Sequence, residues 1–149
     1  MAIVTNARLT WVYYSSLLLL PKTAEFIKGK VNVVFARVDG LNLPSSEWKI
    51  SSFMILYESL NLDVSAVNNI VVIGDSMNEM AAGQQLKKRL PTCVLKLIKM
   101  QDAPSHHELL KQLKVIRSGW NKLLNDSRNI DLKMRRQEQK KDIEVEKPE

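Results

Sequence analysis

Short apolar runs alternate with longer segments of helical periodicity along this chain. The runs are continuous and rich in β-branched residues, which is typical of strands that are buried on both faces of a sheet. The predicted strands are Ala2–Thr5, 30–38, Ile70–Ile73 and Cys93–Ile98. The predicted helices between them are 9–28, broken or kinked at Pro21, then 45–60 and 78–90. This alternation predicts an α/β fold, with a parallel sheet covered by helices on both faces.

A long final helix is predicted to begin after Ser105. Ser105 and Glu108 have the spacing of a capping box, in which each side chain satisfies a free backbone N–H group. The apolar residues of this helix recur every three or four positions, so they share one face. The stripe consists of Leu109, Leu113, Ile116, Trp120 and Leu123. We expect it to pack on the sheet or on a partner, and thus to serve as an interaction element.

The apolar stripe fades after Asn125, and the remaining residues form a charged tail. Basic and acidic residues are equally numerous in this tail, so it cannot build a core of its own. We expect a domain at 1–125 and a partly helical tail at 126–149, with the helix continuing to about Gln139. The tail is expected to be dispensable for folding and needed for docking.

The formal net charge of the 149 residues is +6, and it lies on the body because the tail is neutral. The densest basic cluster is Lys87, Lys88 and Arg89, at the end of a predicted helix. Since no aromatic residues are interleaved with it, a solvated helix end is favoured over nucleic-acid binding. Nucleic acid is therefore not an expected partner.

The single cysteine, Cys93, cannot form an internal disulfide and lies in an apolar run. This is typical of a buried, reduced thiol in an intracellular protein. The apolar run at 17–20 is too short for a membrane span, and the N-terminus lacks the basic region of a secretory signal. Cytoplasmic, cytoskeletal or axonemal, and mitochondrial locations remain open.

A series of short motifs resembles one known family. The series consists of Thr5-Asn6-Ala7, Trp11-Val12, Pro21, Ala36-Arg37, Trp48-Lys49 and Gly74-Asp75-Ser76 with Glu79. In its order and spacing it resembles the haloacid dehalogenase-like hydrolases, and more narrowly a subgroup found in protists and algae. The resemblance implies a Rossmann-like three-layer sandwich, and it covers roughly residues 2–125.

The same resemblance implies roles for individual residues. Thr5, Asn6 and Lys49 match phosphate-binding positions, where Lys49 would neutralise a phosphoryl group. Asp75 and Glu79 match metal-binding positions that hold Mg²⁺ in the family. Phosphoryl transfer to a carboxylate requires these residue types, because a cation must offset the charge that develops.

The motif that carries the nucleophile has no counterpart in this sequence. In the family, two aspartates precede the threonine, and here only Met1–Val4 precede Thr5. We therefore expect a pseudophosphatase with no catalytic residues, acting as a structural or interaction subunit of a large assembly of proteins. No cofactor is expected, and any Mg²⁺ binding would be weak, since two carboxylates leave most of the Mg²⁺ coordination shell to water. The alternative is an Mg²⁺-dependent phosphatase half, whose nucleophile strand comes from another polypeptide or from unannotated upstream sequence.

Several of these residues also have structural interpretations. Asp75 could cap the helix that begins near Met77, and Lys49 could be a surface lysine, although an inward orientation is favoured. His106 and His107 lack acidic or cysteine partners at metal-ligand spacing, so both are expected at the surface.

The missing segment would leave a gap in the centre of the sheet, because the family places its first strand there. Unpaired backbone groups cost free energy when they are buried, so the gap must be filled or closed. We expect residues 2–5 to pair directly with 70–74, giving a four-stranded sheet. The alternative is that a strand from another chain inserts between them.

Overall fold

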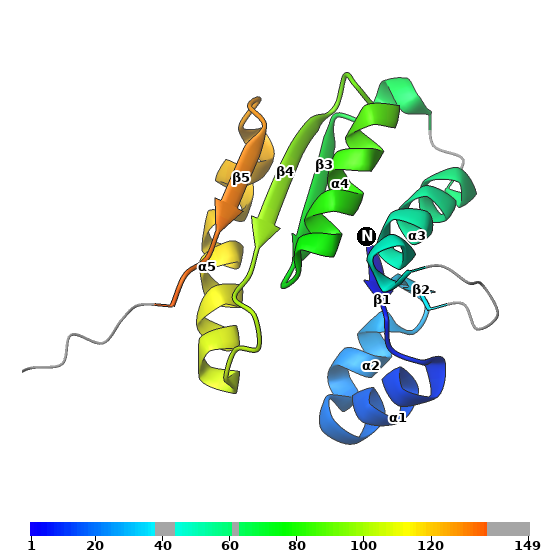
Figure 1. Ribbon diagram of the computed structural model, residues 1–149. Helices are drawn as coiled ribbons and strands as arrows, with labels where there is room; N and C mark the ends of the chain where they lie inside the picture. Colours follow the sequence, from blue (N-terminus) through cyan, green and yellow to red (C-terminus); the bar gives the residue numbers. More distant parts are fainter. Residues whose placement is uncertain (38–43, 61–62, 137–149) are drawn as a thin grey trace, which may run out of the picture.

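The computed structural model describes residues 1–37, 44–60 and 63–136 of the chain (Figure 1). In chain order the elements are β1 (Ala2–Thr5), α1 (Leu9–Leu19), α2 (Pro21–Ile27), β2 (Asn32–Phe35), α3 (Ser45–Ser59), a 3₁₀ turn (Val64–Ala66), β3 (Asn69–Gly74), α4 (Met77–Arg89), β4 (Val94–Lys99), α5 (His106–Asn125) and β5 (Ile130–Lys133). Every strand and helix predicted up to Asn125 is present, with boundaries shifted by a few residues. Position 38 and residues 137–149 lie outside the described part of the chain.

The described strands form two parallel sheets. β1 pairs with β2 in register from Ala2 opposite Asn32, and the second sheet has the order β3-β4-β5. The Rossmann-like α/β class and the parallel pairing are therefore confirmed. The expectation of four strands is corrected, because β5 adds a fifth to those predicted.

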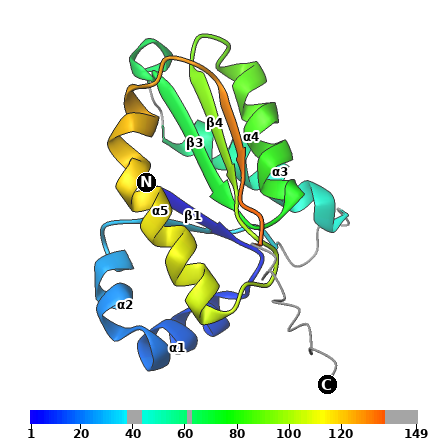
Figure 2. The same cartoon turned by 90° about the vertical axis from the view of Figure 1, so that its left-hand side faces the viewer.

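Helices cover both faces of the second sheet (Figures 1 and 2). On one face, α4 lies so close that a Cβ atom added to Gly83 would come 2.8 Å from Val72 Cγ2 and 2.9 Å from Leu97 Cδ2. On the other face, the fully buried Lys96 donates a hydrogen bond from Nζ to the Leu124 carbonyl oxygen of α5, at 3.0 Å. Adjacent residues of β4 thus point to opposite layers, as a pleated strand requires.

The hydrophobic core lies between the second sheet and α4. Its buried side chains are Ile70, Val72, Met80, Leu90, Cys93, Leu95 and Leu97, with Phe53 and Tyr57 of α3 packed against them. The Cys93 thiol is buried as expected and donates a hydrogen bond to the Val67 carbonyl oxygen, at 2.8 Å.

The helical segment expected at 9–28, broken or kinked at Pro21, is broken there into α1 and α2. Pro21 occupies the first turn of α2, where its missing N–H group costs nothing. Neither helix has a fully buried residue, and Trp11, Tyr14 and Leu18 of α1 are mostly exposed. This hairpin therefore contributes no fully buried residue to the core.

The expected direct pairing of residues 2–5 with 70–74 is wrong. Within the described residues, β1 pairs only with β2, β3 pairs only with β4, and a cleft lies between them. The physical reason is that α3 contacts both β1 and α4, which fixes the separation of the two sheets. The prediction assumed buried backbone groups in the gap, but an open cleft lets water satisfy them.

The beginning of the predicted tail is also different from the expectation. After α5 the chain turns at Asp126 and forms β5, which pairs in parallel with β4 from Lys96 opposite Ile130. The predicted helical continuation is therefore wrong for residues 126–136. Residues up to Lys133 belong to the folded sheet, so the expected boundary at 125 is corrected.

Candidate functional site: the cleft between the sheets

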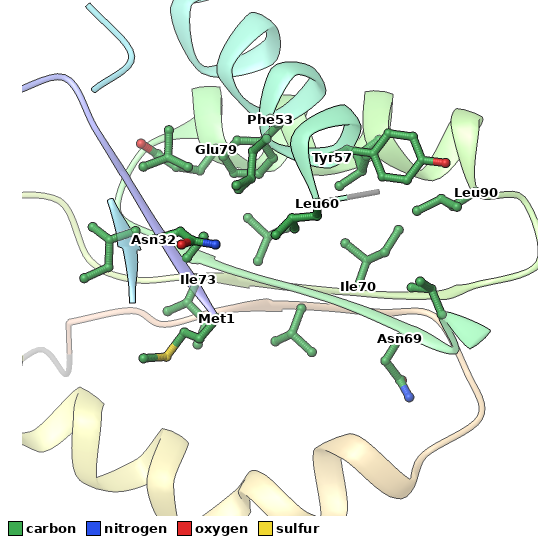
Figure 3. A pocket seen from close by; sticks show the side chains of 18 residues that line it. Met1, Asn32, Phe53, Tyr57, Leu60, Asn69, Ile70, Ile73, Glu79 and Leu90 are labelled. Atoms are coloured by element: carbon green, nitrogen blue, oxygen red, sulfur yellow. The ribbon is translucent and has the colours of Figure 1, made fainter. Parts of the chain in front are cut away.

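One hollow among the described residues is the cleft between β1 and β3 (Figure 3). It is a cavity of about 480 Å³, lined by residues of both strands and of α3 and α4. Phe53 and Tyr57 of α3 and Leu90, directly after α4, contribute apolar surface on one side. The cleft is therefore a largely apolar site whose two long walls are strand edges.

Lys49 of α3 lies at the end of the cleft where β1 and β3 terminate. Its side chain is only 6% exposed, and its Nζ group lies 3.2 Å from Glu79 Oε1 and donates a hydrogen bond to the Val4 carbonyl oxygen. The favoured inward orientation is thus observed, and the surface alternative is wrong. Because the lysine is neutralised by this ion pair, it joins the β1–β2 sheet to the start of α4.

Glu79 has a second structural role in the first turn of α4. It accepts hydrogen bonds from the backbone N–H and the hydroxyl of Ser76, while Ser76 Oγ accepts from Asn78 N–H at 3.1 Å. Burial raises the pKa of the Glu79 carboxyl, but the Ser76 hydrogen bond and the Lys49 cation outweigh burial and leave the pKa below its ordinary value of 4.5. The carboxylate is therefore stabilised in its charged form.

This pKa shift predicts a specific pH dependence. The folded-state pKa is lowered, so Glu79 stabilises the fold above about pH 4.5 and loses this effect as the pH falls through the folded-state value. We expect Glu79→Gln to lower the melting temperature at neutral pH, since Lys49 would keep a buried charge without a counterion. Thermal unfolding measured from pH 7 to pH 3 should show a shallower acid dependence in this variant than in the native chain.

The matched control is Glu25→Gln on α2, which removes the same charge from an exposed position. It should leave both the melting temperature and its acid dependence close to native. Equal acid profiles for the native chain and Glu79→Gln would contradict the prediction.

The other residues carried over from the resemblance do not join the Lys49–Glu79 pair. Thr5 is half-buried at the end of β1 and accepts a hydrogen bond from Ala7 N–H at 3.1 Å, and Asn6 is exposed. Asp75 follows β3 and is exposed, without a hydrogen bond or ion pair to any described residue. Its expected capping role is wrong, because Ser76 caps α4.

The described residues contain no group of three or more His, Cys, Asp or Glu side chains that could hold a metal ion. The sequence singled out two carboxylates as metal ligands, Asp75 and Glu79. The Glu79 carboxylate already binds Ser76 and Lys49. His106 and His107 are exposed in the first turn of α5, as expected.

The stripe on α5 is only partly covered. Leu123 is buried and Ile116 is half-buried, whereas Leu109, Leu113 and Trp120 are 38%, 48% and 36% exposed. Sequence reasoning missed Gln112, which is buried on the inward face of this helix and accepts a hydrogen bond from Gln101 N–H at 2.8 Å. Gln112 lies four residues before Ile116, a spacing that places both on the same face of the helix. The residue was overlooked because its side chain is polar.

No family model, no curated protein and no solved structure matches this chain. The resemblance to haloacid dehalogenase-like hydrolases therefore stays a hypothesis. Within the described ranges, no helix combines the length and the apolar character that a bilayer span requires.

Proposed function

We propose that this chain is a noncatalytic interaction subunit of a larger intracellular assembly, built on a haloacid dehalogenase-like domain. The observation that carries the proposal is the apolar surface of α5, where Leu109, Leu113 and Trp120 remain exposed in the isolated chain. Neighbouring exposed apolar side chains on a helix favour a protein contact. The pairing of Lys49 with Glu79 supports the noncatalytic part, since both groups are used within the fold.

The association can be tested with paired substitutions on α5. We expect the tagged chain, expressed in cells of its source, to sediment as a complex much heavier than its own 17.0 kDa. Replacing Leu109 and Leu113 by serine should shift it toward the monomer, because the apolar contact is removed. Both leucines are already exposed, so the variant should keep the native melting temperature.

The matched control replaces Lys111 and Lys114 by serine, since these residues are also exposed on α5. It should sediment like the native chain. A native chain that sediments as a monomer in these extracts would overturn the proposal.

The second candidate function is an Mg²⁺-dependent phosphatase half whose nucleophile is supplied by another polypeptide. The observation that favours it is the buried Lys49 amine, which lies where β1 and β3 end. Thr5 is the last residue of β1, and Asp75 directly follows β3. An assay with an aryl phosphate and Mg²⁺ on the tagged chain recovered from cells of its source, together with the polypeptides that it binds, separates the two candidates. Turnover that Asp75→Asn abolishes would support the phosphatase, whereas the interaction subunit predicts none.

A further inference from the structure

Two strands with one unpaired edge each face the same cavity. β1 is paired with β2 on its far side, β3 is paired with β4 on its far side, and residues of both strands line the cleft between them. Among the described residues, no backbone hydrogen bond joins β1 to β3. The cleft therefore presents backbone donors and acceptors without a strand partner on two opposite walls, although the Val4 carbonyl oxygen accepts a hydrogen bond from Lys49.

The hydrogen bonds to β2 identify the backbone groups of β1 that face the cleft. Ala36 N–H donates to the Thr5 carbonyl oxygen at 2.8 Å, so the backbone of Thr5 faces β2. Backbone groups of successive strand residues point to opposite edges, so Ala2 and Val4 face the cleft. The bond from Lys49 to the Val4 carbonyl oxygen agrees with this assignment.

The same reasoning applies to β3. The carbonyl oxygens of Asn68 and Gly74 accept hydrogen bonds from Val94 and Met100, at 2.8 and 2.7 Å, so the even-numbered residues face β4. The odd-numbered residues of β3 therefore face the cleft. We use the term cleft-facing amides for the backbone N–H groups of the five residues that face the cleft. These residues are Ala2, Val4, Asn69, Val71 and Ile73.

Both edges run in the same direction. Lys49 contacts the Val4 oxygen near the end of β1 and also Glu79, in the helix that follows the end of β3. Figures 1 and 2 show the two strands ending on the same side of the molecule. One strand inserted parallel to both would therefore complete both ladders and merge the two sheets.

Helices α3 and α4 cover one open face of this slot. Phe53, Tyr57 and Leu90 lie on the side of α3 and α4, while Met1 lies on the side of α5 (Figure 3). Among the lining residues that the structure describes, Glu79 is the one with a charged side chain, and Lys49 already pairs with it. A strand in this position would bury the side chains that meet α3 and α4, so these side chains must be apolar.

We propose that the cleft binds one extended, apolar segment of another polypeptide as a parallel β-strand between β1 and β3. The inference rests on the proposed interaction function and gives the class of partner for the cleft. Strand addition to a sheet edge is a known mode of peptide recognition, in which main-chain hydrogen bonds supply affinity. The segment needs about four to six residues, the lengths of β1 and β3. The chain's own residues 137–149 are a poor match, because their sequence is mostly charged.

The test uses the full chain, labelled with ¹⁵N, and a synthetic peptide with a Val-Ile-Val-Val core between lysines. Amide exchange is followed by NMR. In the free chain the cleft-facing amides should exchange fast, whereas those of Ile70 and Val72, which face β4, are protected. Saturation with the peptide should slow the cleft-facing amides by about tenfold or more and leave the β4-facing amides unchanged.

Two matched peptides keep the test specific. N-methylation of alternate residues blocks one edge of the peptide, and N-methylation of the intervening residues blocks the other edge. Each should weaken binding by about tenfold or more, because a strand in the slot pairs on both sides. Fusing the unmodified core to the N-terminus through a flexible Gly/Ser linker raises its effective concentration, so even weak binding is detected.

Several results would overturn the inference. One is binding without protection of the cleft-facing amides, which would indicate a groove ligand instead of a strand. A second is the absence of protection of these amides in the fused chain. A third is protection in the free chain that rises with its concentration, which would indicate a second copy of the chain. A fourth is protection in the free chain that is lost when residues 137–149 are deleted, which would indicate that these residues occupy the cleft. If the strand test fails while α5 still holds the chain in a heavy complex, only this inference is lost.

Discussion

Truncation of the chain after Asn125 is expected to lower the free energy of unfolding by about 4 kcal/mol, and the melting temperature by roughly 10 °C. The truncation removes the whole β4–β5 ladder, from Lys96 opposite Ile130 to Lys99 opposite Lys133. It also removes Asn129, whose side-chain oxygen accepts a hydrogen bond from Leu95 N–H at 2.8 Å. Each lost hydrogen bond contributes about 1 kcal/mol net.

The control is a chain that ends at Arg136 and therefore keeps β5. Arg136 Nε also lies 2.8 Å from Glu108 Oε1, so the connection to α5 is retained. Thermal unfolding followed by circular dichroism should give a near-native transition for this chain. Equal melting temperatures for both truncated chains would show that β5 contributes little, as the sequence alone suggested.

Gly83→Val is expected to destabilise the fold by about 3 kcal/mol, because α4 has no room for a branched side chain. A Cβ atom at this position would already lie 2.8 Å from Val72 Cγ2, and Val72 is a stiff, β-branched residue held in β3. Replacing glycine within a helix usually stabilises it, by up to about 1 kcal/mol for alanine. Chemical denaturation should show that the steric clash exceeds this gain.

Gly119→Ala on α5 separates the two effects. This glycine is exposed, and an added Cβ atom would meet nothing within 4 Å. The substitution should therefore stabilise the chain by up to about 1 kcal/mol. A Gly83→Val variant that is as stable as the native chain would contradict the tight packing of α4 on the sheet.

The sequence predicted the local elements well, because these depend on nearby residues. Continuous apolar runs identified β1 to β4, and the spacing of Ser105 and Glu108 predicted the capping box that begins α5. The same pattern at Ser76 and Glu79 was present but was assigned to ligand chemistry. Asp75 was therefore considered as the N-cap of α4, whereas the structure shows that Ser76 is the N-cap.

Features that depend on distant contacts were harder to predict. The strand Ile130–Lys133 is short and half-polar, and only its pairing with β4 makes it a strand. The separation of β1 from β3 is set by α3, which no local pattern encodes. The inward orientation of Lys49 was favoured, but its ion pair with Glu79 joins residues 30 positions apart in the sequence.

The order β3-β4-β5 in space repeats the order of these strands along the chain. Each strand therefore finds its neighbour after one intervening helix has formed. By contrast, the contact between Lys49 and the Val4 carbonyl oxygen spans 45 positions. Folding should thus begin within residues 69–133, and the β1–β2 unit should dock on this nucleus in a later step.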